Sequence, residues 1–158
     1  MGKVVNITDE GILYLEWLEG IKGVEEREGL DEHEDCAVRA IASSTGSTYL
    51  EAHEFCKKRF GRKHRKGVEG WIGKMEAIQG LNFLNGTNVK KIKKYDHRYT
   101  ISVEDFIKEY PRGIYIVNVS GHVFTIWNSI VIGNDEDRER IHWKIGAIFE
   151  IYNKDEQE

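Results

Sequence analysis

The sequence has few residues that crosslink or interrupt a chain: it contains two cysteines and one proline among 158 residues. Two cysteines exclude a small secreted scaffold that several disulfides hold together. No apolar run approaches the roughly 20 residues that a membrane-spanning helix needs. The first residues also lack the apolar core of a secretory signal peptide. We therefore expect a soluble, cytoplasmic protein that has no membrane partner.

The residues that are present favour one folded domain. Hydrophobic residues make up 40% of the chain and aromatic residues 11%, which is not typical of a disordered protein. A domain of this size buries about 70% of the surface that its unfolded chain exposes, so a core can form without crosslinks. We expect a single domain over 1–158, with an acidic N-terminal segment (1–35), a helical part (36–80) and a sheet part (113–152).

The charges are unevenly distributed. The net charge is −4, yet residues 1–35 are acidic, and seven lysines and arginines lie within Lys57–Lys66. Such a run is typical of a surface that binds nucleic acid. It also follows a predicted helix, whose negative C-terminus basic residues stabilise. Because the whole chain is acidic, we keep nucleic-acid binding through Lys57–Lys66 as a minor alternative.

The hydrophobic period changes along the chain and predicts helices first and strands afterwards. Residues 23–35 are expected to form a loop, and residues 81–99 short strands and turns. The predicted helices are about 9–21, 36–42, a helix from the capping box Thr48-x-x-Glu51 to Gly61, about 68–79, and Ser102 to Tyr110.

Alternating apolar residues predict strands in the last third of the chain. We expect strands at 113–120, 122–127 and 130–133, with a tight turn at Asn128-Ser129, and another along 141–151. The fold class is therefore α+β, with N-terminal helices packed on a C-terminal antiparallel sheet. The four tryptophans are expected in the core: Trp17, Trp71, Trp127 and Trp143.

Two residues are candidates for catalysis. Cys36 begins a predicted helix, where free amides and the helix dipole favour a thiolate. His122 begins a predicted strand, and a two-residue turn at Asn128-Ser129 places Asp135 opposite it and Asn134 one position away. A thiol, an imidazole and a polar group that orients the ring are the parts of a thiol nucleophile.

Several motifs occur in the order that one enzyme family shows. They are Asp35-Cys36-Ala-Val-Arg39-Ala40, Thr45-Gly46-x-x-Tyr49-x-x-Ala52-His53, Gly61-Arg62-Lys63, Gly67-Val68, and Pro111-x-Gly113-x-Tyr115 followed by Gly121-His122-Val-Phe. Over residues 31–135 the sequence resembles papain-like thiol hydrolases, and more specifically small papain-like proteins of bacteriophages and bacteria.

The resemblance implies a papain-like fold and a thiol hydrolase (a cysteine peptidase or amidase) that cleaves an amide, peptide or isopeptide bond. It implies Cys36 as nucleophile, His122 as base, and Asn134, or alternatively Asp135, as the third catalytic member. A protein or peptide substrate, no cofactor, and a location in the cytoplasm (the host cytoplasm for a phage protein) follow from the same resemblance.

The sequence departs from the family's pattern before the cysteine. Papain-like enzymes place a glutamine there, which helps to hold the oxyanion, whereas this chain has Glu32, His33, Glu34 and Asp35. Nearby carboxylates also oppose thiolate formation by raising the pKa of a cysteine. These departures favour an alternative function, a non-catalytic papain-fold binding module such as a phage protein that inhibits a host factor.

Two histidine–cysteine pairs indicate a second minor alternative. His33-x-x-Cys36 and His53-x-x-Cys56 together supply four side chains of the kinds that bind zinc. Cys56, however, also continues the apolar face of its predicted helix, which a place in the core explains. We therefore expect no metal and no cofactor.

Overall fold

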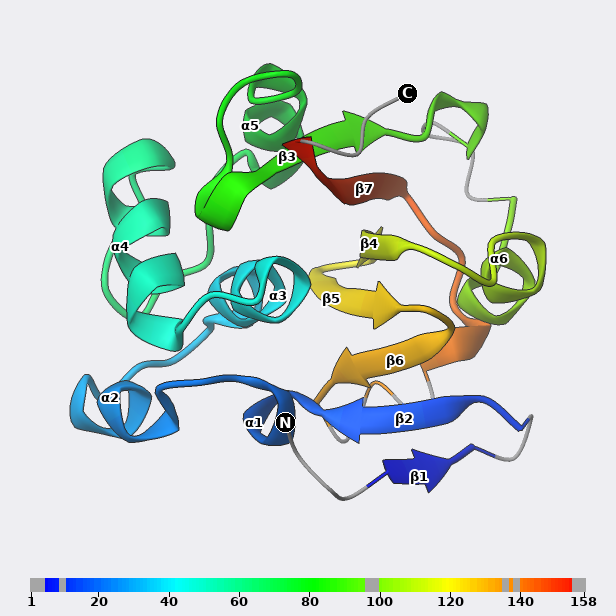
Figure 1. Cartoon of the computed structure of the whole chain (residues 1–158), viewed down its shortest axis with the longest axis horizontal. Helices are drawn as coiled ribbons and strands as arrows, with labels where there is room; N and C mark the ends of the chain where they lie inside the picture. The colour runs from blue at the N-terminus through cyan, green and yellow to red at the C-terminus, as the bar shows by residue number, and fades with distance from the viewer. Residues whose placement is uncertain (1–4, 9–10, 96–99, 135–136, 138–139, 155–158) are drawn as a thin grey trace.

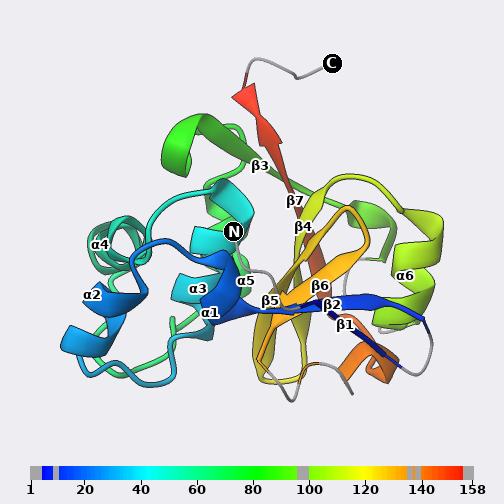
Figure 2. The same ribbon diagram turned by 60° about the horizontal axis from the view of Figure 1, so that its bottom comes forward.

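The computed structural model describes residues 5–8, 11–95, 100–134, 137 and 140–154 (Figure 1). It has a mixed α+β fold in which seven strands form one sheet, in the order β1-β2-β6-β5-β4-β7-β3. Most of the helices gather at one side of this sheet, and α6 lies at the other side (Figures 1 and 2). None of the helices in the described ranges has the length and apolar character needed to cross a bilayer.

The sheet corrects one expectation. It is not purely antiparallel or purely C-terminal, because β2 pairs in parallel with β6, and both β1 and β2 precede the long helices. The strands are β1 (Val5–Ile7), β2 (Leu13–Glu16), β3 (Thr87–Lys91), β4 (Ile114–Val119), β5 (His122–Trp127), β6 (Ile130–Gly133) and β7 (Ala147–Asn153).

The expected helix at 9–21 is wrong, because β2 occupies its centre. Tyr14 and Leu15 are both buried, and among the described residues of this range only Trp17–Gly20 are helical, as the short helix α1. The apolar residues Ile12, Leu15 and Leu18 have helical spacing, but Leu13 and Leu15 also alternate like a strand. Pairing with β1 and β6 satisfies the backbone of β2 and decides between the two patterns.

The other helices largely follow their capping signals. In α4, Thr48 and Glu51 form the reciprocal capping box that the sequence predicts, and Ser102 caps α6. The expected loop at 23–35 instead contains a helix without buried residues, so no apolar periodicity could indicate it. The helices are α2 (Val24–Gly29), α3 (Cys36–Thr45), α4 (Tyr49–Arg59), α5 (Trp71–Ala77) and α6 (Val103–Glu109), with 3₁₀ turns η1 (Leu84–Gly86), η2 (Lys93–Tyr95) and η4 (Arg140–His142).

The hairpin of β5 and β6 has the predicted turn and register. Asn128 and Ser129 have φ angles of 47° and 72°, as a tight turn with two left-handed residues requires. Trp127 pairs with Ile130 on either side of this turn. The ladder ends with β6 at Gly133, before it reaches the level of His122.

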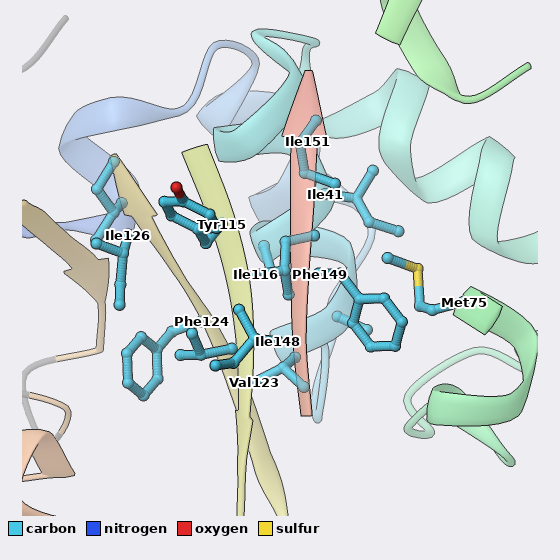
Figure 3. Packing of buried hydrophobic residues seen from close by; sticks show 14 of the residues in the cluster. Ile41, Met75, Tyr115, Ile116, Val123, Phe124, Ile126, Ile148, Phe149 and Ile151 are labelled. Atoms are coloured by element: carbon cyan, nitrogen blue, oxygen red, sulfur yellow. The ribbon is translucent and has the colours of Figure 1, made fainter. Parts of the chain in front are cut away.

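Helix α3 packs against the sheet through small and branched side chains, and Ala37, Val38, Ala40 and Ile41 are buried. Ile41 of α3 lies beside Ile151 of β7, and Met75 of α5 lies beside Phe149 of β7 (Figure 3). Small residues let the helix approach the strands closely, which holds its N-terminus in a defined position.

One core prediction is wrong. Trp143 is 43% exposed, because 141–151 is not a continuous strand: η4 precedes β7, which begins only at Ala147. Trp17 and Trp71 are buried as expected, and Trp127 is half-buried.

Candidate active site

Cys36 is the first residue of α3, at the end of the helix where main-chain N–H groups lack partners within the helix. Asp35 precedes it, and its side chain does not cap the helix. That carboxylate instead accepts hydrogen bonds from Arg27, Arg39 and the hydroxyl of Tyr49. The N-terminus of α3 therefore keeps its positive field beside the thiol, which favours a thiolate.

His122 begins β5 and lies against Cys36. Its Nε2 is 2.9 Å and 3.1 Å from the two carboxylate oxygens of Asp137, so Nδ1 is the ring nitrogen that remains for the thiol. The imidazole and the thiol line the same cleft, and each shifts the pKa of the other. The ring thus lies between the thiol and a buried carboxylate.

The pKa values of the two groups move in opposite directions. Burial raises the pKa of the Cys36 thiol, but His122, the main chain of Val123 and the charge of Arg39 together outweigh it and lower this pKa below its ordinary value. Burial also disfavours the charged form of His122, yet the hydrogen bonds with Asp137 and Cys36 raise its pKa to about 9. Both changes favour a thiolate paired with an imidazolium.

The third group beside the ring is Asp137, which the sequence reasoning missed. Asn134 does not take this place: it contributes its main-chain N–H, which donates to Asp137 Oδ2 at 2.6 Å, and Nε2 of His122 bonds the carboxylate of Asp137. Asp135, the alternative third member, lies outside the described residues. The structure therefore replaces Asn134 by Asp137 as the neighbour of the histidine.

Gly133 lets Asp137 come close to the end of β6. The N–H of Asp137 donates to the carbonyl of Asn134 at 2.9 Å. A Cβ atom on Gly133 would lie 2.2 Å from Asp137 Oδ2, so only glycine lets the carboxylate come this close. Several acidic residues follow Gly133, and no spacing rule distinguishes Asp137 among them.

Two of the carboxylates near Cys36 do not oppose the thiolate in the way the sequence indicates. Asp35 is buried, and its bonds to Arg27, Arg39 and Tyr49 outweigh the cost of burial and lower its pKa to about 2. Glu32 has a pKa of about 2 for similar reasons, because Arg62 and His53 hold it. A nearby cation thus balances each negative charge, which weakens the effect of that charge on the pKa of the Cys36 thiol.

Trp17 and Arg39 complete the surroundings of the histidine. The Trp17 ring lies 5.8 Å from the imidazole of His122 between centroids, and it is 1% exposed. The guanidinium of Arg39 lies over Trp17, 4.6 Å from the ring centre. After the larger effects of burial and His122, the charge of Arg39 also lowers the pKa of Cys36. An apolar ring therefore keeps water from one side of the imidazole.

A cleft of about 250 Å³ opens at the thiol. Its lining residues are Cys36, Ala37, Gly67, Val68, Trp71, Asn118, Gly121, His122 and Val123. Asn118 carries the side-chain amide of this lining, and its position on β4 is directly opposite Val123.

The four residues of the zinc alternative do not come together. His53 is bonded to Glu32 at 2.5 Å, and His33 is exposed and beside Glu34. Cys56 is fully buried, and burial raises its pKa to about 12, so its thiol stays protonated. In the described part of the chain, no three potential metal ligands form a group.

Comparisons with protein-family models, with curated proteins and with solved structures found no match. The interpretation of the site therefore depends on the geometry of Cys36, His122 and Asp137.

Proposed function

We propose that this protein is a papain-like thiol hydrolase that cleaves an amide, peptide or isopeptide bond. The observation that carries the proposal is His122, which lines the same cleft as Cys36 and whose Nε2 bonds the buried carboxylate of Asp137. The order of the parts also supports it, with the thiol on a helix N-terminus, the base on a strand and the carboxylate on the segment after the returning strand.

In the proposed reaction the Cys36 thiolate attacks the carbonyl carbon of the bound substrate. A carbon–sulfur bond forms, and the oxygen takes the negative charge. His122, as imidazolium, gives its proton to the leaving nitrogen, so that the amine departs and a thioester remains. His122 then removes a proton from water, the hydroxide attacks the thioester, and the released thiolate and imidazolium restore the starting pair. Asp137 stabilises the imidazolium and holds the ring.

The oxyanion requires donors other than the absent glutamine. The free N–H groups in the first turn of α3 are one source. The side chain of Asn118 is a second, since its Nδ2 donates one hydrogen to the carbonyl of Val119 and carries another. We therefore assign Asn118 as the side-chain donor at the oxyanion.

Alkylation by iodoacetamide at pH 6.5 tests the pair directly. We expect Cys36 to react much faster than a model thiol, and His122→Ala to slow it to the model rate, because the thiolate loses its counter-ion. Cys56, buried and protonated, is the internal control and should not react in the folded protein. Mass spectrometry of peptides separates the two sites. A Cys36 rate equal to that of a model thiol and unaffected by His122→Ala would refute the proposal.

A non-catalytic binding module remains the competing function, and the missing glutamine is the observation that favours it. A pull-down with Cys36→Ala separates the two. Retained partner binding together with a slow Cys36 in the alkylation assay would support the module, whereas a fast Cys36 and acylation by peptidyl thioesters would support the hydrolase.

A further inference from the structure

A larger hollow lies next to the cleft at Cys36. It has a volume of about 440 Å³ and is lined by Gly61, Lys63, Lys66, Gly67, Val68 and Glu69. Because Gly67 and Val68 border both spaces, the cleft and the hollow are adjacent, and we call them together the groove. Together the two volumes fall within the roughly 300–1,000 Å³ of typical ligand pockets.

The loop that carries the lysines is tied to the segment before the nucleophile. Arg62 is buried and donates to both oxygens of Glu32, and the main-chain N–H of Arg65 donates to Glu32 as well. His64 bonds the carbonyl of Leu30. Because Glu32 lies four residues before Cys36, these contacts hold the loop in a defined place beside the active site.

Most cations of the Lys57–Lys66 run already have a partner within the chain. Arg62 pairs with Glu32, Lys58 with Glu54 and Arg65 with Asp31. Arg59 lies over the ring of Phe55, 5.3 Å from its centre. Lys63 and Lys66 are different: within the described ranges, no carboxylate oxygen lies within 4.0 Å of either ammonium group, and both line the groove.

We propose that this groove binds an acidic peptide segment, with carboxylates at Lys63 and Lys66 and an acyl group at Cys36. The proposal that the groove binds this peptide depends only on the residues of the groove, whereas cleavage of the bound peptide rests on the function proposed above. Glu69 also lines the hollow, so the side chains that line the hollow have a net charge of +1. A protein that holds duplex DNA neutralises roughly 6–10 phosphates, and two lysines are too few for that ligand.

The test uses short peptidyl thioesters of alanine and glycine in which one position carries Glu, Gln or Lys. One series places this residue in the acyl group of the thioester, and another series places it in the thiol that leaves. We expect the wild-type protein to form the acyl-enzyme roughly 1.5–5-fold faster with Glu than with Gln, because one exposed ion pair contributes about 0.2–1 kcal/mol and 1.36 kcal/mol is tenfold. The preference should weaken in 0.5 M salt, because salt screens exposed charges.

Variants at the lysines assign the preference to the groove. We expect the double variant Lys63→Glu/Lys66→Glu to prefer Lys peptides, and Glu69→Gln to strengthen the preference for Glu. Lys57→Glu is the matched control: Lys57 is exposed on the same run but lines neither space, so this variant should behave like the wild type.

The outcomes separate the binding site from the reaction. Acylation of all peptides without a charge preference would refute the acidic-peptide site and leave the thiol hydrolase intact. Fluorescence polarisation with Cys36→Ala covers the reverse case: acidic peptides that bind, and lose affinity in the double variant, without ever acylating the wild type would support the site and refute the hydrolase. Tight binding of a DNA duplex that the double variant abolishes, with no peptide discrimination, would overturn the proposal in favour of nucleic acid.

Discussion

Asp137→Asn removes the charge that the histidine faces while keeping nearly the same shape. The asparagine can still accept the hydrogen bond from Nε2 of His122, so the ring keeps its orientation. What is lost is the negative charge 2.9 Å from that nitrogen. The consequence should be a weaker preference for the imidazolium and therefore for the thiolate.

The structure sets the size of this effect. The rise in the pKa of His122 from 6.5 to about 9 corresponds to roughly 3 kcal/mol in favour of the protonated ring. Burial works against that rise, and Cys36 contributes to it together with Asp137. We therefore expect Asp137→Asn to slow the alkylation of Cys36 at pH 6.5 by roughly 10–100-fold, where 1.36 kcal/mol is tenfold.

The assay is iodoacetamide alkylation over a range of pH, and urea unfolding verifies that each variant is folded. Asp105→Asn, the same change on an exposed residue of α6, is the matched control and should leave the rate unchanged. Asn134→Ala should also have little effect, because Asn134 contributes its main-chain N–H. A normal rate in folded Asp137→Asn, or a larger loss in Asn134→Ala, would show that the carboxylate does not support the pair.

Three further predictions concern the site and its scaffold. Gly133→Ala places a Cβ 2.2 Å from Asp137 Oδ2 and should slow the alkylation of Cys36 as Asp137→Asn does. The control is Gly73→Ala in α5, which has open space around it and should stabilise the protein by about 0.5–1 kcal/mol in urea unfolding. Cleavage of a peptidyl amide should decrease above pH 9, because His122 loses the proton that the leaving nitrogen needs, while iodoacetamide alkylation continues; parallel pH profiles for the two reactions would contradict the assignment. The stability that this histidine contributes should be complete below pH 6.5 and lost by about pH 9. Thr48→Ala should lower the free energy of unfolding by about 1 kcal/mol through loss of the α4 cap and leave the alkylation rate unchanged, so a slower rate would connect α4 to the site.

Local signals in the sequence determined much of the scaffold. The capping box at Thr48 and the cap at Ser102 predicted where α4 and α6 begin, since a cap depends on residues three positions apart. The turn at Asn128-Ser129 predicted the register of β5 with β6 for the same reason. The sequence also selected Cys36 and His122 as partners, and the structure places both in the lining of one cleft.

Only the tertiary structure decided the features that depend on distant segments. The parallel pairing of β2 with β6 joins residues more than 100 positions apart, and no local period encodes it. The balance of Asp35 by Arg27, Arg39 and Tyr49 likewise depends on the packing of three helices against one another. Counting carboxylates along the chain therefore overestimated their effect on the thiol.

The third member of the site shows this division most clearly. Strand pairing has a period of two residues and predicts which side chains face each other only as long as the ladder lasts. The pairing of β5 with β6 ends at Ile132, and the place of Asp137 depends on its close approach to Gly133. The sequence determined that a polar group follows β6, and the close approach at Gly133 decided that Asp137 reaches His122.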